Sequence, residues 1–475
     1  MNRIQLLLLA ILFTGFTQLP AQIIYVNSTS SGLNNGSSWV NAYNSLQTAL
    51  SNASQGHQIW VAEGTYKPTL IHNPDSSFNL KKGVEIYGGF NGTETGLNQR
   101  NWRTNITLLS GDIDNNDLAS PARSVSDIIG YNSKHVLRIK KIDSTTVMDG
   151  FVITAGCAND TNPTEGGGAI NMDTSYIRII NCTFQANKTH GSLGGGAIHN
   201  MAGSPKFINC RFVNNTAGGV GGAFKTKYGS PVFIGCLFLN NKNLYSGGGA
   251  IQESSAFIKL NNCTFVGNDS IALRNNASHA TVTNCIFWGN IGGEIVDEGT
   301  SVATVSYSIV NGGYTGTGNL DADPLFINQS SGNFQLSSTS PAINAGKSDT
   351  SGLFLNAYDL DGNNRIEGAL IDIGAFEYQS SSAIASQSVV ETSFNIFPNP
   401  SNTNITCVVK MDKPSNLLIE VMDITGKVVQ RTNYHQLPSG NNKLPLKLDN
   451  IGKGVYIISL KDSKEIYRNQ KFVIQ

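Results

Sequence analysis

Between residues 165 and 295 single apolar residues alternate with polar residues in short runs, and these runs recur. Residues 181–187, 209–215, 235–241, 262–268 and 284–290 read NCTFQAN, NCRFVNN, GCLFLNN, NCTFVGN and NCIFWGN. Each run holds a Cys, a Phe two residues later and an Asn three residues after that, and the Cys lie 28, 26, 27 and 22 residues apart. A period in the twenties over five copies predicts a solenoid of stacked repeats.

The residues between these runs indicate which kind of repeat the chain contains. A glycine-rich element recurs as GGGAI at 166–170, 194–198 and 247–251, as GGAF at 221–224 and as GGEI at 292–295. Leucine-rich repeats share the period, but they need Leu at most core positions and glycines interrupt the helix of each unit. Short apolar runs separated by turns favour strands. The sequence therefore predicts an all-β chain built as a parallel β-helix, one coil per repeat. The segment QIWVAEGTY at 58–66 resembles the entry segment of right-handed parallel β-helix proteins, which implies the same hand here.

Equivalent residues of successive coils should lie above one another, about 4.8 Å apart. We predict three buried columns, which are Cys182, Cys210, Cys236, Cys263 and Cys285, then Phe184, Phe212, Phe238, Phe265 and Phe287, then Asn187, Asn215, Asn241, Asn268 and Asn290. Residues stacked in this way point in the same direction, which does not suit a disulfide, so the five Cys should be free thiols. Cys157 and Cys407 lie outside the column and stay unassigned.

The Asn of each repeat falls where the chain must turn. Asn tolerates left-handed backbone and can hydrogen-bond to its copy in the next coil. The NCT tripeptides at Asn181 and Asn262 match the N-glycan acceptor pattern, but their repetition inside a core strand makes them structural. A further coil is predicted at 148–156, with Phe151, Ile153 and Gly156 in the Cys, Phe and Asn columns.

The predicted β-helix spans residues 22–378, with a cap at 22–57, repeats over about 148–310 and a closing segment at 320–378. In the cap, Asn44 should begin a short helix whose apolar side is Leu46, Ala49, Leu50 and Ala53. Such a helix can cover the open end of a solenoid. Residues 379–391 are small and polar and should form a linker.

Composition and the N-terminal segment indicate where the protein is located, but not which activity it has. The 475 residues hold 33 basic and 33 acidic side chains, and no basic tract favours nucleic acid. Residues 1–21 combine Arg3, an apolar run and Ala21 near a cleavage site, which is typical of a secretory signal peptide. We therefore expect an exported, monomeric mature chain without a transmembrane span.

Two stretches of the predicted β-helix resemble known families. The pairing of GGAI with FxxN over 165–295 resembles the repeats of polymorphic outer membrane proteins, which are β-helical surface adhesins, within the wider pectin-lyase-like fold. SPAINAG and DIGAFE, within 321–346 and 358–378, resemble the choice-of-anchor Q ending of bacterial surface proteins. Both resemblances imply a protein displayed on or released from a cell surface.

The last segment, residues 392–475, should form a small immunoglobulin-like β-sandwich of some seven strands, with a hairpin turn at Thr425 and Gly426. FNIFPNPSNTNI, DITGKVV, GVYIISL and KFVIQ together resemble the type A sorting domain of the type IX secretion system of Bacteroidota. The resemblance implies recognition by that machinery, followed by release or attachment at the outer membrane surface.

Candidate chemistry comes from the residues that follow each GGAI element. The successive columns are Asn171, His199, Lys225, Gln252, Arg274 and Val296, then Met172, Asn200, Thr226, Glu253, Asn275 and Asp297, then Asp173, Met201, Lys227, Ser254, Asn276 and Glu298. Glu253 and Asp297, two coils or about 9.6 Å apart, form a candidate catalytic pair with Arg274 between them. His199, Lys225, Lys227, Glu253 and Arg274 are candidate ligand-groove residues.

Two acidic groups are candidate calcium ligands, namely Asp112, Asp114 and Asp117 in GDIDNND and Asp359 and Asp361 in DLDGNN. Neither matches the spacing of a calcium-binding loop, and turn-forming Asp and Asn explain both without a metal. No other cofactor is predicted.

Two functions remain open from the sequence. The first is a non-enzymatic surface protein that binds a glycan or another cell surface along its groove. The second is a polysaccharide lyase or glycoside hydrolase acting on an acidic polysaccharide, since β-helices host both kinds of enzyme. Release of sugar products, lost on Glu253→Ala or Asp297→Ala, would favour the enzyme.

Overall fold

The computed structural model describes residues 21–379, except 161, 163 and 246, and residues 394–474, except 402–403, 412–413, 424–427, 449–450 and 462–465. The chain divides into two compact units, residues 1–379 and 380–475. Most of the predicted signal peptide and most of the predicted linker lie outside the described residues. Within the described residues no helix is long and apolar enough to cross a membrane.

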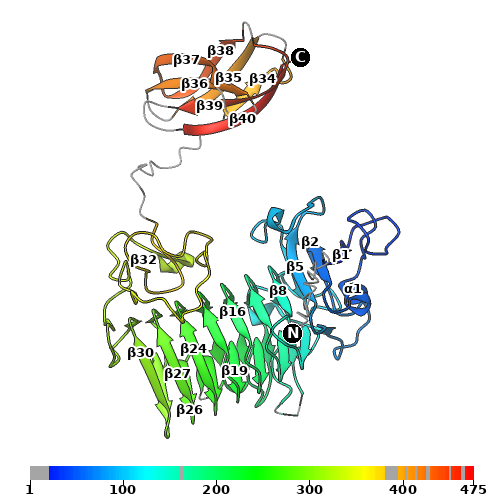
Figure 1. Cartoon of the computed structure of the whole chain (residues 1–475), viewed down its shortest axis with the longest axis vertical. Coiled ribbons are helices and arrows are strands. Elements are labelled where there is room, and N and C mark those ends of the chain that lie inside the picture. Colours follow the sequence, from blue (N-terminus) through cyan, green and yellow to red (C-terminus); the bar gives the residue numbers. More distant parts are fainter. Residues whose placement is uncertain are drawn as a thin grey trace, which may run out of the picture. The chain divides into compact units, whose positions relative to one another are not determined.

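The first unit is a parallel β-helix, as predicted (Figure 1). Each coil contributes one strand to each of three long parallel sheets. The first sheet contains β1 (Ile23–Val26), β2 (Gln58–Ala62), β5 (Glu85–Phe90), β8 (Val147–Asp149), β12 (Arg178–Ile180), β16 (Lys206–Ile208), β20 (Val232–Ile234), β24 (Phe257–Asn261), β27 (His279–Thr283) and β30 (Val302–Ser306). The second contains β3 (Gly64–Tyr66), β6 (Thr107–Ser110), β9 (Val152–Thr154), β13 (Thr183–Gln185), β17 (Arg211–Val213), β21 (Leu237–Leu239), β25 (Thr264–Val266), β28 (Ile286–Trp288) and β31 (Ile309–Val310).

The third sheet carries the strands that follow the glycine-rich elements. It contains β4 (Phe78–Asn79), β7 (Leu137–Lys140), β11 (Ile170–Asp173), β15 (Ile198–Met201), β19 (Phe224–Lys227), β23 (Gly248–Ser254), β26 (Ile271–Asn276) and β29 (Ile295–Glu298). A short fourth sheet contains β10 (Cys157–Ala158), β14 (Lys188–Thr189), β18 (Thr216–Ala217) and β22 (Lys242–Asn243). The 3₁₀ turns are η1 (Leu97–Gln99), η2 (Val125–Asp127) and η3 (Gln329–Ser331), and β32 (Phe326–Asn328) pairs antiparallel with β33 (Asn333–Leu336).

The predicted Cys and Phe columns are confirmed. Parallel pairing sets Phe184 opposite Phe212, and the register continues through Phe238, Phe265 and Phe287. Successive rings stack with centroids 5.0, 4.6, 4.4 and 4.4 Å apart. The five column Cys are buried and unpaired. Ile153 continues the Phe column at its start, as predicted.

The Asn column forms a hydrogen-bonded ladder. The side-chain amide nitrogen of each Asn donates to the amide oxygen of the next, over 3.1, 3.0, 3.0 and 2.8 Å from Asn187 to Asn290. The backbone N–H of each rung from Asn187 to Asn268 donates to the same oxygen. At the start, Gly156 N–H donates to Asn187, so Gly156 occupies the predicted rung. Each buried amide is thereby satisfied by its neighbours.

The left-handed backbone expected at these Asn lies elsewhere, and that part of the prediction was wrong. Positive φ occurs one residue before each Cys, as at Asn181 and Asn209 with φ of 51°, and one residue before each ladder Asn, as at Ala186 with φ of 50°. The turn residues therefore point their side chains outward, whereas the ladder Asn keep theirs inside the solenoid.

The N-terminal helix is α1 (Leu46–Asn52), and its buried residues are Leu46, Ala49 and Leu50, which join the solenoid core as predicted. Its N-cap is Ser45 rather than Asn44, because the Ser45 hydroxyl accepts from the backbone N–H of Thr48. The Asn44 amide instead donates to backbone carbonyls of the preceding loop, at Asn27 and Ser30.

The second unit holds two antiparallel sheets, which agrees with the predicted β-sandwich. One contains β34 (Phe394–Phe397), β35 (Asn404–Met411) and β38 (Gly440–Lys447), and the other contains β36 (Ser415–Asp423), β37 (Val428–Leu437), β39 (Gly454–Lys461) and β40 (Ile466–Ile474). Residues from both sheets share one apolar core, in which Cys407 is buried. Strands β36 and β37 pair antiparallel as a hairpin requires, but Thr425 and Gly426 lie outside the described residues.

Candidate functional site

The closing segment covers the later coils of the second sheet. There the outward-facing residues are apolar, including Leu237, Val266 and Ile286, and they pack against Phe334 and Ile373 of the closing segment and its neighbours. Burying apolar surface on both faces of these strands stabilises the segment against the solenoid. Over these coils the closing segment leaves a hollow of about 460 Å³ beside Val266 and Phe334, and no charged side chain lines it.

Outward-pointing Asn of the repeats hold the closing segment in place. Asn209 donates to the carbonyls of Tyr358 and Asp359, over 3.1 and 3.0 Å, and Asn262 donates to that of Asp372 over 2.9 Å. Asn284 accepts from the backbone N–H of Lys347 at 2.8 Å. Asn262 is fully buried by this contact, which agrees with the structural interpretation of its NCT tripeptide.

Asn181, one coil earlier, makes no such contact. Its amide donates to Asp149, at 2.9 Å, on the neighbouring coil of the solenoid. The outward residues here are Val152, Thr183 and Arg211, which are only partly buried. The first coils of the repeat region thus stay uncovered between the closing segment and the loop of residues 97–106.

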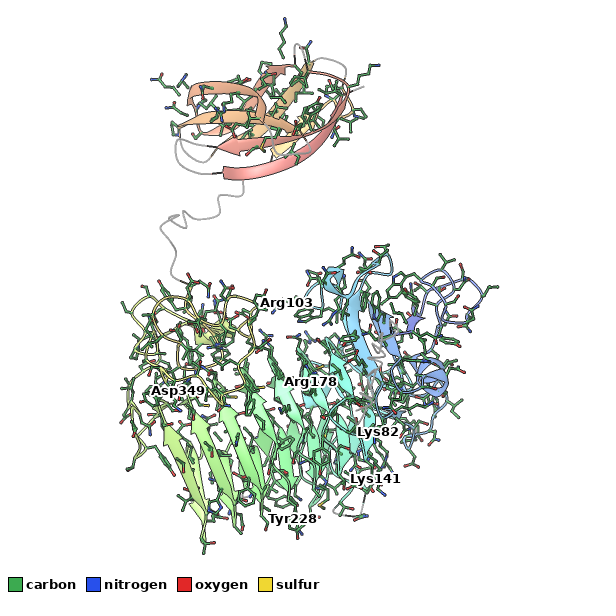
Figure 2. The ribbon with its side chains drawn as sticks, viewed as in Figure 1. Lys82, Arg103, Lys141, Arg178, Tyr228 and Asp349 are labelled. Carbon is green, nitrogen blue, oxygen red and sulfur yellow. The ribbon has the colours of Figure 1, made fainter. Side chains whose placement is uncertain are left out.

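Two adjoining hollows, of about 470 and 430 Å³, occupy this uncovered stretch. We call them together the corner cleft. Both are lined by Trp102, Arg103, Asn181 and Asn209. The first also contacts Arg211, Gln335, Asp361 and Asn363, and the second contacts Arg100, Asp149, Asn356 and Tyr358. Figure 2 labels Arg103 on the loop that forms one wall.

The corner cleft is lined by three carboxylates, those of Asp149, Asp359 and Asp361, and the first and the last are engaged by arginines. Asp149 pairs with Arg100 at 2.6 Å, and Asp361 pairs with Arg211 at 2.7 Å. Gln335 donates a further bond to Asp361, at 2.9 Å. Burial lowers the pKa of the Arg211 guanidinium, although Asp361 opposes that shift. These pairs fix the floor and walls of the cleft as a hydrogen-bonded frame.

Aromatic and cationic groups complete the walls. The Trp102 indole contacts the guanidinium carbons of Arg100 and Arg103, which lie 4.8 and 5.0 Å from its ring centroid. Arg103 donates to the carbonyl of Leu360, at 3.3 Å, and has no ion pair among the described residues. Tyr358 is 54 % exposed on the side formed by the closing segment. The cleft offers an aromatic surface, amides and one uncompensated cation.

The predicted columns of the third sheet are confirmed in register, including Glu253 opposite Asn275 and Asn275 opposite Asp297. Their side chains do not build a groove, however. Glu253 is fully buried, and neither of its carboxylate oxygens has a hydrogen-bond partner among the described residues. Burial, and then the charge of Asp297, raises the pKa of Glu253 to about 8.

Asp297 lies at the exposed end of the same column. It accepts from Asn275, from the backbone N–H of Ala303 at 3.1 Å and from the Tyr314 hydroxyl at 2.7 Å. Arg274 belongs to the neighbouring column and pairs with Glu298 instead. Because Glu253 faces the interior and Asp297 closes the end of the column, the structure does not bring them together at a surface where a substrate could enter.

The predicted groove cations are neighbours on the third sheet, but they differ in exposure and do not line the corner cleft. His199 is 1 % exposed, its Nδ1 lies 3.1 Å from the Thr164 carbonyl, and burial, followed by the charge of Lys225, lowers its pKa to about 4. Lys225 is partly buried in the same column, whereas Lys227 is exposed and lies over the Tyr228 ring. These residues lie on the third sheet, outside the residues that line the corner cleft.

The acidic loops considered for calcium use their carboxylates within the protein. Asp117 accepts from the backbone N–H of Ile129 and from the side chain of Asn132, and burial raises its pKa to about 6. Asp114 accepts from the backbone of Tyr131, and Asp112 lies 3.7 Å from Lys67. Over the described part of the chain, no three His, Cys, Asp or Glu side chains are arranged to hold a metal ion.

The second acidic pair is equally occupied. Asp359 is fully buried and accepts from the backbone N–H groups of Asp361, Asn363 and Glu377, over 3.0, 2.8 and 3.0 Å. Asp361 is the partner of Arg211 in the corner cleft.

Sequence reasoning missed the residues that line the cleft. Trp102 and Arg103 lie in the run RNWR, where two arginines flank an indole, and this mixture of cationic and aromatic residues was the available signal. Arg211 stands inside a repeat, between the column residues Cys210 and Phe212. Tyr358 precedes the acidic loop that drew attention to calcium. The four meet only because separate segments fold onto one corner of the solenoid.

The fold and cleft define a β-helical solenoid with an open corner, linked in sequence to a small β-sandwich. Residues 395–475 match the family described as the secretion system C-terminal sorting domain. The protein is therefore handled by the type IX secretion machinery and is secreted or attached to the cell surface. This confirms the predicted sorting domain and location.

Comparison with whole proteins adds little. The crystal structure of pectate lyase Pel9A is similar at 14 % sequence identity, with a TM-score of 0.35, over 76 % of this chain and 97 % of that chain. No curated protein matches the chain.

Proposed function

We propose that this exported protein binds a glycan in the corner cleft and does not cleave it. The observation that carries the proposal is the cleft itself, where Trp102 and Tyr358 accompany the side-chain amides of Asn181, Asn209 and Asn356. Aromatic faces stack on the C–H faces of sugar rings, and amides donate to and accept from hydroxyl groups. Open clefts of a few hundred Å³ suit short oligosaccharide segments.

The carboxylates support binding over bond cleavage. Hydrolysis needs one carboxyl as acid and another as base or nucleophile, free to reach the glycosidic bond. In the corner cleft Asp149 and Asp361 each pair with an arginine, and the buried Asp359 accepts from three backbone N–H groups. A carboxyl group whose oxygens already accept hydrogen bonds from the protein is not free to reach a glycosidic oxygen or a water molecule. The proposal agrees with a surface-displayed or released protein that attaches to polysaccharide.

The test is a panel of neutral and acidic polysaccharides, titrated against the purified protein by isothermal calorimetry. Tyr358→Ala should weaken binding of the recognised polysaccharide at least tenfold, because it removes an exposed wall residue. The matched control is Tyr131→Ala, at a tyrosine that is 58 % exposed on another loop and lies outside the cleft lining. Binding that survives Tyr358→Ala and Trp102→Ala, or sugar products released from any panel member, would contradict the proposal.

A further inference from the structure

Next to the corner cleft, the outer face of the first sheet carries two adjacent cations. Strand pairing sets Arg178 of β12 directly beside Lys206 of β16. Neighbouring strands lie about 4.8 Å apart, so the two side chains start from adjacent positions on one face. Figure 2 labels Arg178 on this sheet.

Among the described residues, no acidic side chain forms an ion pair with Arg178 or Lys206. Their neighbours in the same outward column are Val147 on one side and Val232 on the other. Two residues along the same strands, the outward positions are Ile180 and Ile208. Neither cation forms an ion pair with the described residues, whereas Arg100, Arg211 and Arg274 each do. Like charges side by side destabilise a sheet, so the pair has an electrostatic cost that an anion would remove.

The pair is continuous with the corner cleft. Ile180, two residues from Arg178, lines the cleft, and two residues of strand span about 6.6 Å. On the other side, the Lys206 ammonium lies 4.7 Å from the ring centroid of Phe354, which is 52 % exposed. Phe354 precedes Asn356 and Tyr358 in the same stretch of the closing segment. A glycan in the cleft would thus extend toward Arg178 and Lys206 within about one sugar residue.

We infer that Arg178 and Lys206 form a subsite for a sulfate ester on the bound glycan, an inference that rests on the proposed function. A sulfate ester presents three terminal oxygens in a tetrahedral array, so one group can accept from a guanidinium and an ammonium on adjacent strands together. A planar carboxylate matches a single guanidinium in a bidentate pair and leaves the lysine without a partner. The pairing of Arg with Lys therefore favours the tetrahedral anion.

The experiment compares dextran sulfate, dextran and polygalacturonate as probes, titrated by calorimetry against the purified protein at fixed ionic strength. The double variant Arg178→Gln with Lys206→Gln should bind dextran sulfate at least tenfold more weakly than the unaltered protein. The matched control is Lys140→Gln with Lys227→Gln, which removes two exposed cations from the third sheet and should leave the affinity unchanged. Circular dichroism of each variant checks that the solenoid is intact.

The possible outcomes separate this inference from the proposed function. Unchanged affinity of the Arg178 and Lys206 double variant for dextran sulfate overturns the subsite, as does an equal loss in the control. A selective loss of polygalacturonate affinity shows a carboxylate subsite and overturns the sulfate assignment. If the protein binds panel polysaccharides through Tyr358 but ignores dextran sulfate, the proposed function stands and this inference fails.

Discussion

Glu253 offers a sharp test of how the solenoid interior controls stability. Its carboxyl is fully buried in the third-sheet column and has no hydrogen-bond partner among the described residues. Burial, together with the charge of Asp297, raises the pKa of Glu253 from 4.5 to about 8. The folded protein therefore holds the neutral acid at neutral pH, whereas the unfolded chain ionises it.

The sign of the effect follows from these two pKa values. Because the folded pKa lies above the unfolded one, the stabilisation from the bound proton is complete below pH 4.5 and is lost as pH rises through about 8. One pKa unit corresponds to about 1.4 kcal/mol, so the free energy of unfolding should fall by about 5 kcal/mol across this window. By pH 7 about 3 kcal/mol of that loss has occurred.

Glu253→Gln replaces the carboxyl by a neutral group of similar shape and should abolish this pH dependence. The variant should match the unaltered protein near pH 4.5 and exceed it by about 5 kcal/mol at pH 9. Urea unfolding followed by tryptophan fluorescence is the assay, because the four Trp, at 39, 60, 102 and 288, all lie in the first unit.

The control is Glu298→Gln, at a carboxylate that is partly exposed and paired with Arg274. It should change stability by less than about 1 kcal/mol, as partly exposed ion pairs usually do. The reasoning is refuted if Glu253→Gln keeps the pH dependence of the unaltered protein, or if it is the less stable of the two at pH 9.

Three further results are expected. Asn241→Ala removes a ladder side chain that donates to Phe212 and Asn268 and accepts from Asn215, so the free energy of unfolding in urea should fall by roughly 2–4 kcal/mol. The control is Asn276→Ala, at an exposed residue, and it should lower that free energy by less than about 0.5 kcal/mol. Equal losses in the two variants would contradict a stabilising role of the ladder. Iodoacetamide should label Cys157 alone in the native protein, because the other six Cys are buried. Mass spectrometry of the labelled protein is the measurement, and modification of the five column Cys as fast as Cys157 would show that they are not in the core. Chelation by EDTA should leave the melting temperature unchanged, since the carboxylates of the two candidate calcium loops already interact with groups of the protein. A lower melting temperature that added calcium reverses would instead support a bound calcium ion.

The repeat pattern determined the fold because it is local and periodic. A Cys, a Phe and an Asn at fixed offsets can be stacked in register only if each repeat is one coil. A single short apolar run could belong to several kinds of structure, but five copies with the same offsets favour one. The Phe column and the Asn ladder follow from that register alone. The C-terminal sorting domain could also be recognised from the sequence, because its motifs lie within one contiguous stretch.

Other features depended on contacts between distant segments. Glu253 and Asp297 share a column in sequence and in structure, yet strand alternation does not say which face of a coil is interior, and the third sheet places Glu253 inside. The corner cleft depends on where the closing segment ends on the solenoid, which Asn209 and Asn262 decide through their hydrogen bonds. Trp102 and Tyr358 are 256 residues apart in the chain, so no local pattern could pair them. The sequence by itself determined the stacking, whereas the packing of loops onto the stack decided which surface stayed open.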